Sequence, residues 1–221
     1  FKKSNSNYII VYRVYKPYSM EKNIKQRILI LGSSGMLGHV VLQKFLQQKN
    51  YETHDVSYRK KARNNSIICD IIETDKLVDT IKQIKPDVII NCIGVLIKGS
   101  EKNSANAIYV NSYFPHLLVK ISNEHNIKII HISTDCVFSG KKGLYSENDM
   151  RDSDDTYGKS KALGEIFSPP HLTLRTSIIG PEIKLHGEGL FHWFINQQGT
   201  LNGFTESYWS GITTLELAKK I

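Results

Sequence analysis

Three glycines, each separated from the next by two residues, directly follow an apolar run near the start of the chain. The run reads Arg-Ile-Leu-Ile-Leu at residues 27–31, and the segment Gly32-Ser33-Ser34-Gly35-Met36-Leu37-Gly38 comes next. Where a buried strand passes through such a loop into a helix, the first N–H groups of the helix and its positive end are free to bind a pyrophosphate. The segment therefore predicts a dinucleotide phosphate loop, which requires a strand, a tight turn and a helix in that order.

Short apolar runs alternate with segments of helical periodicity over most of the chain. The expected strands cover residues 27–31, 52–57, 66–70, 87–93, 128–133 and 172–177. Apolar residues at helical spacing lie between them: Leu37, Val40, Val41 and Phe45; Leu77, Ile81 and Ile84; and Leu117, Leu118 and Ile121. Strands that alternate with helices predict an α/β fold, here a Rossmann-type doubly wound parallel sheet covered on both faces.

The chain divides into three parts by its pattern. Residues 1–23 are expected to be an N-terminal appendage without order, and residues 24–177 form the predicted Rossmann domain. The regular alternation fades after Gly180-Pro181, so residues 178–221 are expected to be part of a small substrate-binding domain. Thr213-Thr214-Leu215-Glu216 resembles a capping box that opens a final helix. Because that helix reaches Ile221 without a stop signal, we expect the C-terminal domain to be truncated.

The positive charge is concentrated at the start of the chain. The net charge is +8, and residues 1–27 contribute +6 of it because they hold seven Lys or Arg against Glu21 alone. The rest of the chain is therefore close to neutral, which argues against nucleic acid as a partner.

Neither a membrane anchor nor a disulfide scaffold is expected. The apolar stretch at residues 8–15 is interrupted by Arg13 and is shorter than the roughly 20 residues of a membrane span. No small-residue cleavage site follows it, so a signal peptide is not indicated. Cys69, Cys92 and Cys136 are odd in number and form no Cys-x-x-Cys pair, which indicates free thiols. We expect a cytoplasmic protein that has no membrane partner.

Two conflicting signals follow the second expected strand. Asp55 stands where a carboxylate could hold the ribose 2′-hydroxyl of NAD. Arg59, Lys60 and Lys61 come shortly after and could instead accept the 2′-phosphate of NADP. The expected cofactor is therefore NADPH or NADH, and the sequence leaves the choice open.

Two further strand ends carry residues suited to the wall of a cofactor cleft. Asp70 ends the third expected strand, and Asn91-Cys92-Ile93-Gly94 ends the fourth. Ligands of a doubly wound sheet bind outside the carboxyl ends of its strands, so both segments are candidates for dinucleotide contact.

A tyrosine and a lysine lie one helical turn apart after the fifth expected strand. Tyr157 and Lys161 occupy positions i and i+4, and the strand before them ends in Ser133-Thr134-Asp135. A nearby ammonium favours the phenolate of a tyrosine, which would make Tyr157 a usable proton donor near neutral pH. Reduction of a carbonyl requires such a donor, because the oxygen gains a proton as hydride arrives.

Other catalytic patterns have less support. No Gly-x-Ser-x-Gly elbow is present, and no His and Cys residues have the spacing of metal ligands. His131 is expected to lie within the sheet. Cys136 has no positioned base, so a nucleophilic role is not expected.

Four segments together resemble a known superfamily. They are Gly32 to Gly38, Ser133-Thr134-Asp135-Cys136-Val137-Phe138, Tyr157-Gly158-Lys159-Ser160-Lys161-Ala162-Leu163-Gly164-Glu165 and Leu174-Arg175-Thr176-Ser177. In order and spacing these segments are similar to the extended short-chain dehydrogenases/reductases. Within that superfamily they most resemble dTDP-4-dehydrorhamnose reductases and related nucleotide-sugar reductases, over roughly residues 25–221.

The resemblance implies roles for individual residues. Thr134, Tyr157 and Lys161 match the catalytic triad: Tyr157 would protonate the C4 oxygen of a sugar, Lys161 would bind the nicotinamide ribose, and Thr134 would hold the substrate oxygen. The expected cofactor site comprises Gly32, Ser34, Gly35, Met36, Leu37, Gly38, Asp55, Arg59, Asp70, Ile71, Cys92, Ile93, Gly94, Asn111, Tyr157 and Lys161. The expected substrate site comprises Thr134, Asp135, Val137, Phe138, Arg175 and Ile178, and no metal is expected.

Two departures from the family pattern fall in the expected substrate region. The reductases usually have Tyr where this chain has Cys136, and Trp where it has Ile178. Related 4,6-dehydratases carry a Glu base at the position of Cys136, so dehydration is not expected.

The resulting functional expectation is an NAD(P)H-dependent reductase of a nucleotide-activated 4-keto-6-deoxysugar in the synthesis of polysaccharide precursors. An epimerase of the same superfamily and a non-catalytic dinucleotide-binding subunit, as in the relative that regulates methionine adenosyltransferase, remain alternatives. The expected partners are the nucleotide sugar and a second copy of the chain in a homodimer.

Overall fold

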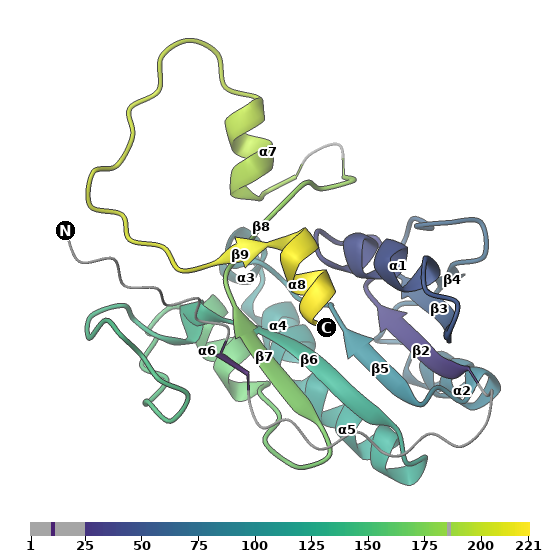
Figure 1. The fold of residues 1–221 in the computed structure, drawn as a ribbon. Helices are drawn as coiled ribbons and strands as arrows, with labels where there is room; N and C mark the ends of the chain where they lie inside the picture. Colours follow the sequence, from purple (N-terminus) through teal and green to yellow (C-terminus); the bar gives the residue numbers. More distant parts are fainter. Residues whose placement is uncertain (1–9, 12–24, 185–186) are drawn as a thin grey trace.

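The computed structural model describes residues 10–11, 25–184 and 187–221, and its centre is a seven-stranded sheet in the order β1-β7-β6-β5-β2-β3-β4 (Figure 1). The strands are β1 (Ile10–Val11), β2 (Gln26–Leu31), β3 (Tyr51–Ser57), β4 (Ile67–Ile68), β5 (Val88–Asn91), β6 (Lys128–Thr134) and β7 (Leu172–Thr176). From β2 the chain adds β3 and β4 on one side and then β5, β6 and β7 on the other, all parallel. The order reverses between β2 and β5, which is where doubly wound folds bind ligands.

The antiparallel edge strand comes from the expected appendage. β1 pairs with β7, with Ile10 opposite Arg175 and Val11 opposite Leu174. This short segment therefore adopts regular structure, in contrast to the disorder expected for residues 1–23. The remainder of the appendage lies outside the described residues.

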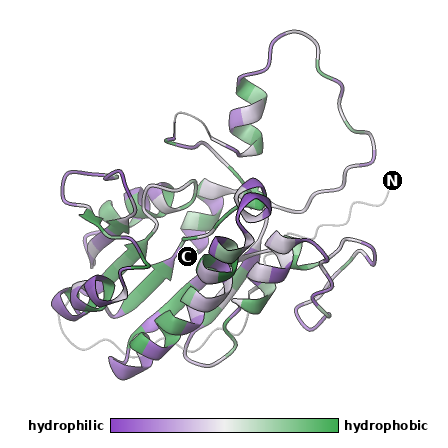
Figure 2. Cartoon of the chain, turned by 180° about the vertical axis from the view of Figure 1, so that it is seen from behind, coloured by the Kyte–Doolittle hydropathy of each residue, from purple (hydrophilic) through white to green (hydrophobic). Residues whose placement is uncertain are grey.

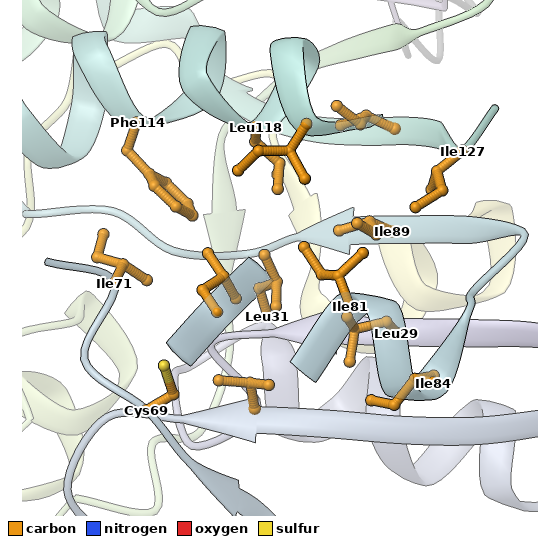
Figure 3. Close-up of a cluster of buried hydrophobic side chains, with 14 of the residues drawn as sticks. Leu29, Leu31, Cys69, Ile71, Ile81, Ile84, Ile89, Phe114, Leu118 and Ile127 are labelled. Atoms are coloured by element: carbon orange, nitrogen blue, oxygen red, sulfur yellow. The ribbon is translucent and has the colours of Figure 1, made fainter. Parts of the chain in front are cut away.

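Helices cover both faces of the sheet as the periodicity predicts. On one face α2 (Thr74–Ile84) and α5 (Phe114–Glu124) pack on alternate residues of the strands, and Figure 3 shows Leu29 and Ile89 of the sheet in one cluster with Ile81 and Leu118. On the other face α1 (Gly38–Leu46) packs on Ile28, Ile30 and their neighbours. Because successive strand residues point to opposite faces, continuous apolar runs such as β2 are buried on both sides. The strands are accordingly coloured hydrophobic along much of their length in Figure 2.

A helical stretch that the periodicity does not predict precedes α5. It consists of α3 (Ile97–Lys102), α4 (Ser104–Ala107) and the π-helix η1 (Ile108–Tyr113), which runs directly into α5. A π-helix widens the turn by one residue and is frequent at functional sites. Here the widened turn carries Asn111, whose contacts are described with the candidate site.

The C-terminal segment contacts the Rossmann body at both of its ends. β8 (Ile178–Ile179) pairs in parallel with β9 (Ile212–Thr213), and α7 (Leu190–Ile195) lies between them in sequence but stands away from the sheet (Figure 1). The final helix α8 (Thr214–Lys220) begins as expected, since Thr213 Oγ1 accepts a hydrogen bond of 3.1 Å from the N–H of Glu216. Leu217 and Ala218 are buried in the same core cluster as α1. Residues 178–221 are therefore not all separate from the expected Rossmann domain.

A buried carboxylate joins the sheet to α6 (Thr156–Leu163). Glu165 accepts two hydrogen bonds from Arg175 on β7, at 2.7 and 2.8 Å, and one of 2.9 Å from the hydroxyl of Ser133 on β6. Arg151 adds an ion pair of 3.1 Å from the loop before α6. Two-point pairing of this kind fixes geometry as well as charge, so the end of β6 and the end of α6 are held in register.

We predict that Glu165→Ala lowers the free energy of unfolding by about 3–5 kcal/mol, because it leaves the Arg175 guanidinium buried without its carboxylate. Urea unfolding followed by circular dichroism measures this change. The control is Glu52→Ala, which removes an exposed pair with His54 and should change stability by less than about 1 kcal/mol. Equal losses in the two variants would contradict the prediction.

Candidate active site

The glycine loop after β2 is shaped by close backbone contacts. Gly32 has φ +81°, a region that other residues rarely adopt, and a Cβ on Gly38 would lie 2.1 Å from the carbonyl oxygen of Gly32. The N–H of Gly35 closes the turn by donating to Gly32 O at 2.9 Å. Each of the three glycines is therefore used for the turn itself, as the sequence predicts.

The loop leaves donors at the start of α1. Within the described residues, the backbone N–H groups of Met36 and Leu37 have no hydrogen-bond acceptor, and Leu37 has no side-chain cap. Unpaired donors at a helix N-terminus suit a pyrophosphate. The donors and the open backbone of the loop thus fit the phosphates of a dinucleotide.

Asp55 is not placed to contact a ribose. It lies inside β3, two residues before the strand ends, and is 1% exposed. Its oxygens accept hydrogen bonds from Ser33 Oγ at 2.6 Å and from Arg63 Nε at 2.7 Å. Of the two signals after this strand, the structure therefore does not favour a ribose contact by Asp55, because its carboxylate is buried and both oxygens have partners in the protein. Its role in this structure is to hold the phosphate loop through Ser33.

The basic residues after β3 remain available. Arg59 is exposed, and its guanidinium stacks 4.5 Å from the ring centroid of Tyr58 and donates to the Tyr58 hydroxyl at 3.1 Å. Lys60 and Lys61 are also exposed. In contrast to Asp55, these cations follow the carboxyl end of the strand, where the adenosine ribose of a dinucleotide lies in this fold.

The two segments expected to line the cofactor cleft differ in the groups that they expose. Asp70 is half-buried and accepts a hydrogen bond of 3.1 Å from the N–H of Ile72, so it also shapes a turn. The side chain of Ile71 is in the core and leaves only its backbone for contact. At the end of β5, a Cβ on Gly94 would lie 3.6 Å from Asn111 Oδ1 and 3.9 Å from Lys161 Nζ. Gly94 therefore keeps open the space in front of the expected catalytic lysine.

Asn111 supports this wall from the π-helix. Its Oδ1 accepts from the N–H of Val95 at 2.8 Å, and its Nδ2 donates to Val95 O at 3.0 Å and to Ser160 Oγ at 3.1 Å. The side chain thus joins the segment after β5 to α6. Because its carboxamide is hydrogen-bonded within the protein, we assign Asn111 a supporting role in the expected cofactor site.

Tyr157 and Lys161 lie on α6, which approaches β6 closely. The helix is capped by Asp155, whose Oδ1 accepts from the N–H of Gly158 at 2.8 Å. A Cβ on Gly158 would lie 2.2 Å from the carbonyl oxygen of Cys136, and one on Gly164 would lie 1.8 Å from that of Asn111. These two glycines explain the spacing of the Tyr-Gly-x-Ser-Lys-x-x-Gly-Glu segment, since α6 could not dock with a side chain at either position.

The helix brings Tyr157 to the end of β6. The Tyr157 hydroxyl lies beside Thr134, which is buried at the last position of the strand. Burial raises the pKa of Tyr157 to about 12, and the neighbouring Thr134 acts in the opposite direction. The expectation that the Lys161 ammonium lowers the pKa of the phenol is therefore wrong for this structure, in which burial has the larger effect. Tyr157 remains a protonated donor at neutral pH.

Lys161 is buried and already has an acceptor. Its Nζ donates to the carbonyl oxygen of Ile132 at 2.7 Å. Burial lowers the pKa of Lys161 to about 8, although Glu165 and Cys92 act to raise it. The ammonium is thus close to losing its proton in the physiological range, and a bound anion would favour the charged form.

The expected substrate residues fall into two groups. Thr134 and Asp135 lie beside Tyr157, and the Thr134 hydroxyl donates to Asp135 Oδ1 at 3.3 Å. Val137 is fully buried, and Arg175 is buried in the pair with Glu165, so neither is placed to contact a substrate. These two expectations are corrected, since both side chains are packed inside the protein.

The remaining two substrate candidates, Phe138 and Ile178, also make contacts within the protein. Phe138 is buried and stacks on Tyr145 with ring centroids 4.4 Å apart. Ile178 pairs with Ile212 in the small sheet and is half-buried against the α1 cluster. Burial raises the pKa of the Cys136 thiol, which agrees with the absence of a nucleophilic role for it.

Two classes of site find no support in the described part of the chain. No group of three or more His, Cys, Asp or Glu side chains there could hold a metal ion. Among the same residues, every helix is too short or too polar to cross a bilayer.

Sequence reasoning missed several supporting residues. Ser33, Ser160 and Glu165 hold the loop and the two catalytic elements in place, but each is a common polar residue without a distinctive spacing of its own. Only the family resemblance, which includes Glu165 and Ser160 in its segments, pointed toward them.

Comparison with known proteins connects this geometry to a family. Over 157 residues the chain is 34% identical to dTDP-4-dehydrorhamnose reductase of Aggregatibacter actinomycetemcomitans, covering 68% of this chain and 51% of that protein. It is 30% identical over 176 residues to methionine adenosyltransferase 2 subunit beta of Danio rerio, covering 77% and 51%. The chain therefore spans about half the length of these relatives.

A solved structure agrees with these relatives. The crystal structure of a hypothetical dTDP-4-dehydrorhamnose reductase from Sulfolobus tokodaii superposes with a TM-score of 0.75 at 29% identity, over 88% of this chain and 70% of that one. The family model described as the RmlD substrate binding domain matches residues 26–192, which include the phosphate loop, Thr134, Tyr157 and Lys161. The predicted likeness to dTDP-4-dehydrorhamnose reductases is confirmed, and the chain belongs to the RmlD substrate binding domain family.

Proposed function

We propose that the protein is an NADPH- or NADH-dependent reductase of a nucleotide-activated 4-keto-6-deoxysugar, acting in the synthesis of polysaccharide precursors. The observation that carries the proposal is the place of the protonated Tyr157 hydroxyl beside Thr134, at the carboxyl edge of the sheet that also carries the phosphate loop. Similarity to a dTDP-4-dehydrorhamnose reductase supports the substrate class.

Thr134, Tyr157 and Lys161 have different roles in the proposed carbonyl reduction. A bound reduced nicotinamide supplies the hydride. Thr134 orients the carbonyl oxygen, and Tyr157 donates the proton that this oxygen takes up as it becomes a hydroxyl. Because burial keeps Tyr157 protonated, the proton is present before the substrate arrives. Lys161, from its place beside Gly94 and Asn111, would hold the nicotinamide ribose.

The cofactor preference follows from the role of Asp55 in this structure. With its carboxylate paired to Ser33 and Arg63, no acidic side chain at the end of β3 is left to repel a 2′-phosphate. Arg59 is exposed at that end and suits two-point binding of a phosphate. We infer a preference for NADPH.

The direct test is to supply a panel of 4-keto nucleotide sugars with NADPH or NADH and to follow loss of the reduced cofactor. Consumption with one of them supports a reductase. Tightly bound NAD and turnover without added reductant would instead identify an epimerase. Dinucleotide binding with no consumption by any sugar would favour a regulatory subunit, although the intact Thr134, Tyr157 and Lys161 count against that alternative.

Removal of the proton donor should abolish most of the activity. Tyr157→Phe should lower kcat by roughly 10²- to 10⁴-fold, the usual contribution of a positioned acid, and leave NADPH affinity nearly unchanged. Steady-state kinetics and fluorescence titration measure the two effects. Tyr113→Phe is the matched control, since Tyr113 is 54% exposed on η1. Full activity in Tyr157→Phe would refute the assignment.

The cation after β3 should decide between the two cofactors. Arg59→Ala should raise the Kd of NADPH about tenfold and that of NADH little, because only NADPH has a 2′-phosphate to pair with the guanidinium. Titration of both cofactors gives the ratio. Lys82→Ala, which removes an exposed cation on α2, is the control for net charge. Equal weakening of both cofactors by Arg59→Ala would exclude Arg59 as the selector.

The titration of Lys161 should set the alkaline limit. Since burial lowers its pKa to about 8, the ammonium is present below that pH and is lost above it, so kcat/KM for reduction should fall as the pH rises through about 8. Tyr157 stays protonated over this range because its pKa is about 12. Lys161→Arg keeps the charge at all these pH values and should remove the decline. A wild-type profile that is flat through this range would contradict the prediction.

A further inference from the structure

A fully buried histidine lies next to the cofactor edge of the sheet without a role in the chemistry above. His131 is 0% exposed on β6, directly opposite Asn91, the last residue of β5. The Nδ1 atom of His131 lies 3.1 Å from Asn91 Nδ2. The Nε2 atom is also buried, and no hydrogen-bond partner for it exists among the described residues.

The hydrogen bonds around Asn91 define the tautomer of His131. The backbone N–H of Ile93 donates to Asn91 Oδ1 at 3.1 Å, so the other end of that carboxamide, the NH₂ group, faces His131. His131 Nδ1 must therefore accept, and the single proton of the neutral ring is on Nε2. Burial lowers the pKa of His131 well below its usual value, with smaller contributions from Lys161 and His116, so the neutral form is maintained.

The hydrogen bonds between His131 and Asn91 and between Asn91 and Ile93 connect the histidine to the segment that packs on the phosphate loop. Asn91 turns the chain after β5, and the turn places Ile93 against Gly32: a Cβ on Gly32 would lie 2.9 Å from Ile93 Cγ1 and 3.2 Å from Ile93 N. A change in the Asn91 carboxamide would therefore displace the segment that packs on the turn of the loop. Gly94, which opens the space in front of Lys161, is the next residue.

A histidine is an unfavourable choice at this position for stability alone. Its Nε2–H is buried without an acceptor among the described residues, and an unsatisfied buried donor lowers stability. An apolar side chain would remove the unpaired Nε2–H but would leave the Asn91 NH₂ group without an acceptor. A histidine at this position is explained if the orientation of the Asn91 carboxamide is worth more to the protein than the stability lost through the unpaired Nε2.

We propose that His131 is a positioning residue for dinucleotide binding: by accepting from Asn91 it holds residues 92–94 against the phosphate loop in the shape that receives the cofactor. The inference rests on the proposed function only in taking NADPH as the ligand. It requires no contact between His131 and the cofactor.

Two variants separate the hydrogen bond from packing. His131→Asn places an oxygen close to the position of Nδ1 and removes Nε2, whereas His131→Leu keeps an apolar volume and removes the acceptor. His171→Leu is the matched control, because His171 is also buried and its Nδ1 accepts from Ile129 N–H at 3.2 Å, near the start of β6 and away from the loop. NADPH affinity is measured by fluorescence titration, and amide hydrogen exchange of Ile93 is measured without ligand.

The proposal expects His131→Leu to raise the Kd of NADPH about tenfold and to accelerate exchange at Ile93. His131→Asn should restore both values to within about twofold of wild type, and His171→Leu should lower stability without affecting either. Unchanged Kd and exchange in His131→Leu, or a His131→Asn variant as impaired as His131→Leu, would overturn the proposal.

The two proposals fail in different ways. If the wild-type protein binds neither NADPH nor NADH, the proposed function is refuted. In that case faster Ile93 exchange in His131→Leu, restored in His131→Asn, still supports positioning of residues 92–94, and unchanged exchange overturns it.

Discussion

The buried pairing of Glu165 with Arg175 and Ser133 is the interaction on which the candidate site depends most. Thr134 ends β6 and Tyr157 lies on α6, and these elements are separated in sequence by the loop that carries Arg151. Glu165 contacts residues from β6, β7 and that loop at the same time. A charge so deeply buried is tolerated only when its partners are complete, so the network admits few alternative arrangements of α6 on the sheet.

Close backbone approach is the second requirement for the site. Gly38 lies against the carbonyl oxygen of Gly32, Gly158 against that of Cys136, and Gly164 against that of Asn111. In each case the missing side chain lets a helix or a turn come near enough for its polar groups to reach the cleft. These glycines are thus positioned where elements of the fold come into backbone contact.

Burial gives the two ionisable groups of the site opposite tendencies. It raises the pKa of Tyr157 and lowers that of Lys161, because in each case the low-dielectric surroundings disfavour the charged form. The phenol is thereby kept as a donor, and the ammonium is made responsive to a bound anion. The neutral His131 behind the site shows the same effect of burial, and its hydrogen bond extends the organised region from β6 to the phosphate loop.

Much of this protein is determined by local sequence. The apolar runs and the helical periodicity defined β2, β3, β6, β7, α1, α2 and α5, because strand and helix periods differ and both are visible in one dimension. The glycine spacing defined the loop, since its steric demand is local. The sequence also identified Tyr157, Lys161 and the strand end at Thr134 as candidates for the catalytic site.

The tertiary structure decided which polar groups are free. Asp55 and Arg59 are four residues apart and looked like equal candidates, yet Asp55 is bound by Ser33 and Arg63 while Arg59 is exposed. Arg175 and Val137 lie in segments typical of the family, but burial removes them from any substrate. Such outcomes depend on partners far away in the chain, and a sequence pattern does not record which side chains the folded core has already paired.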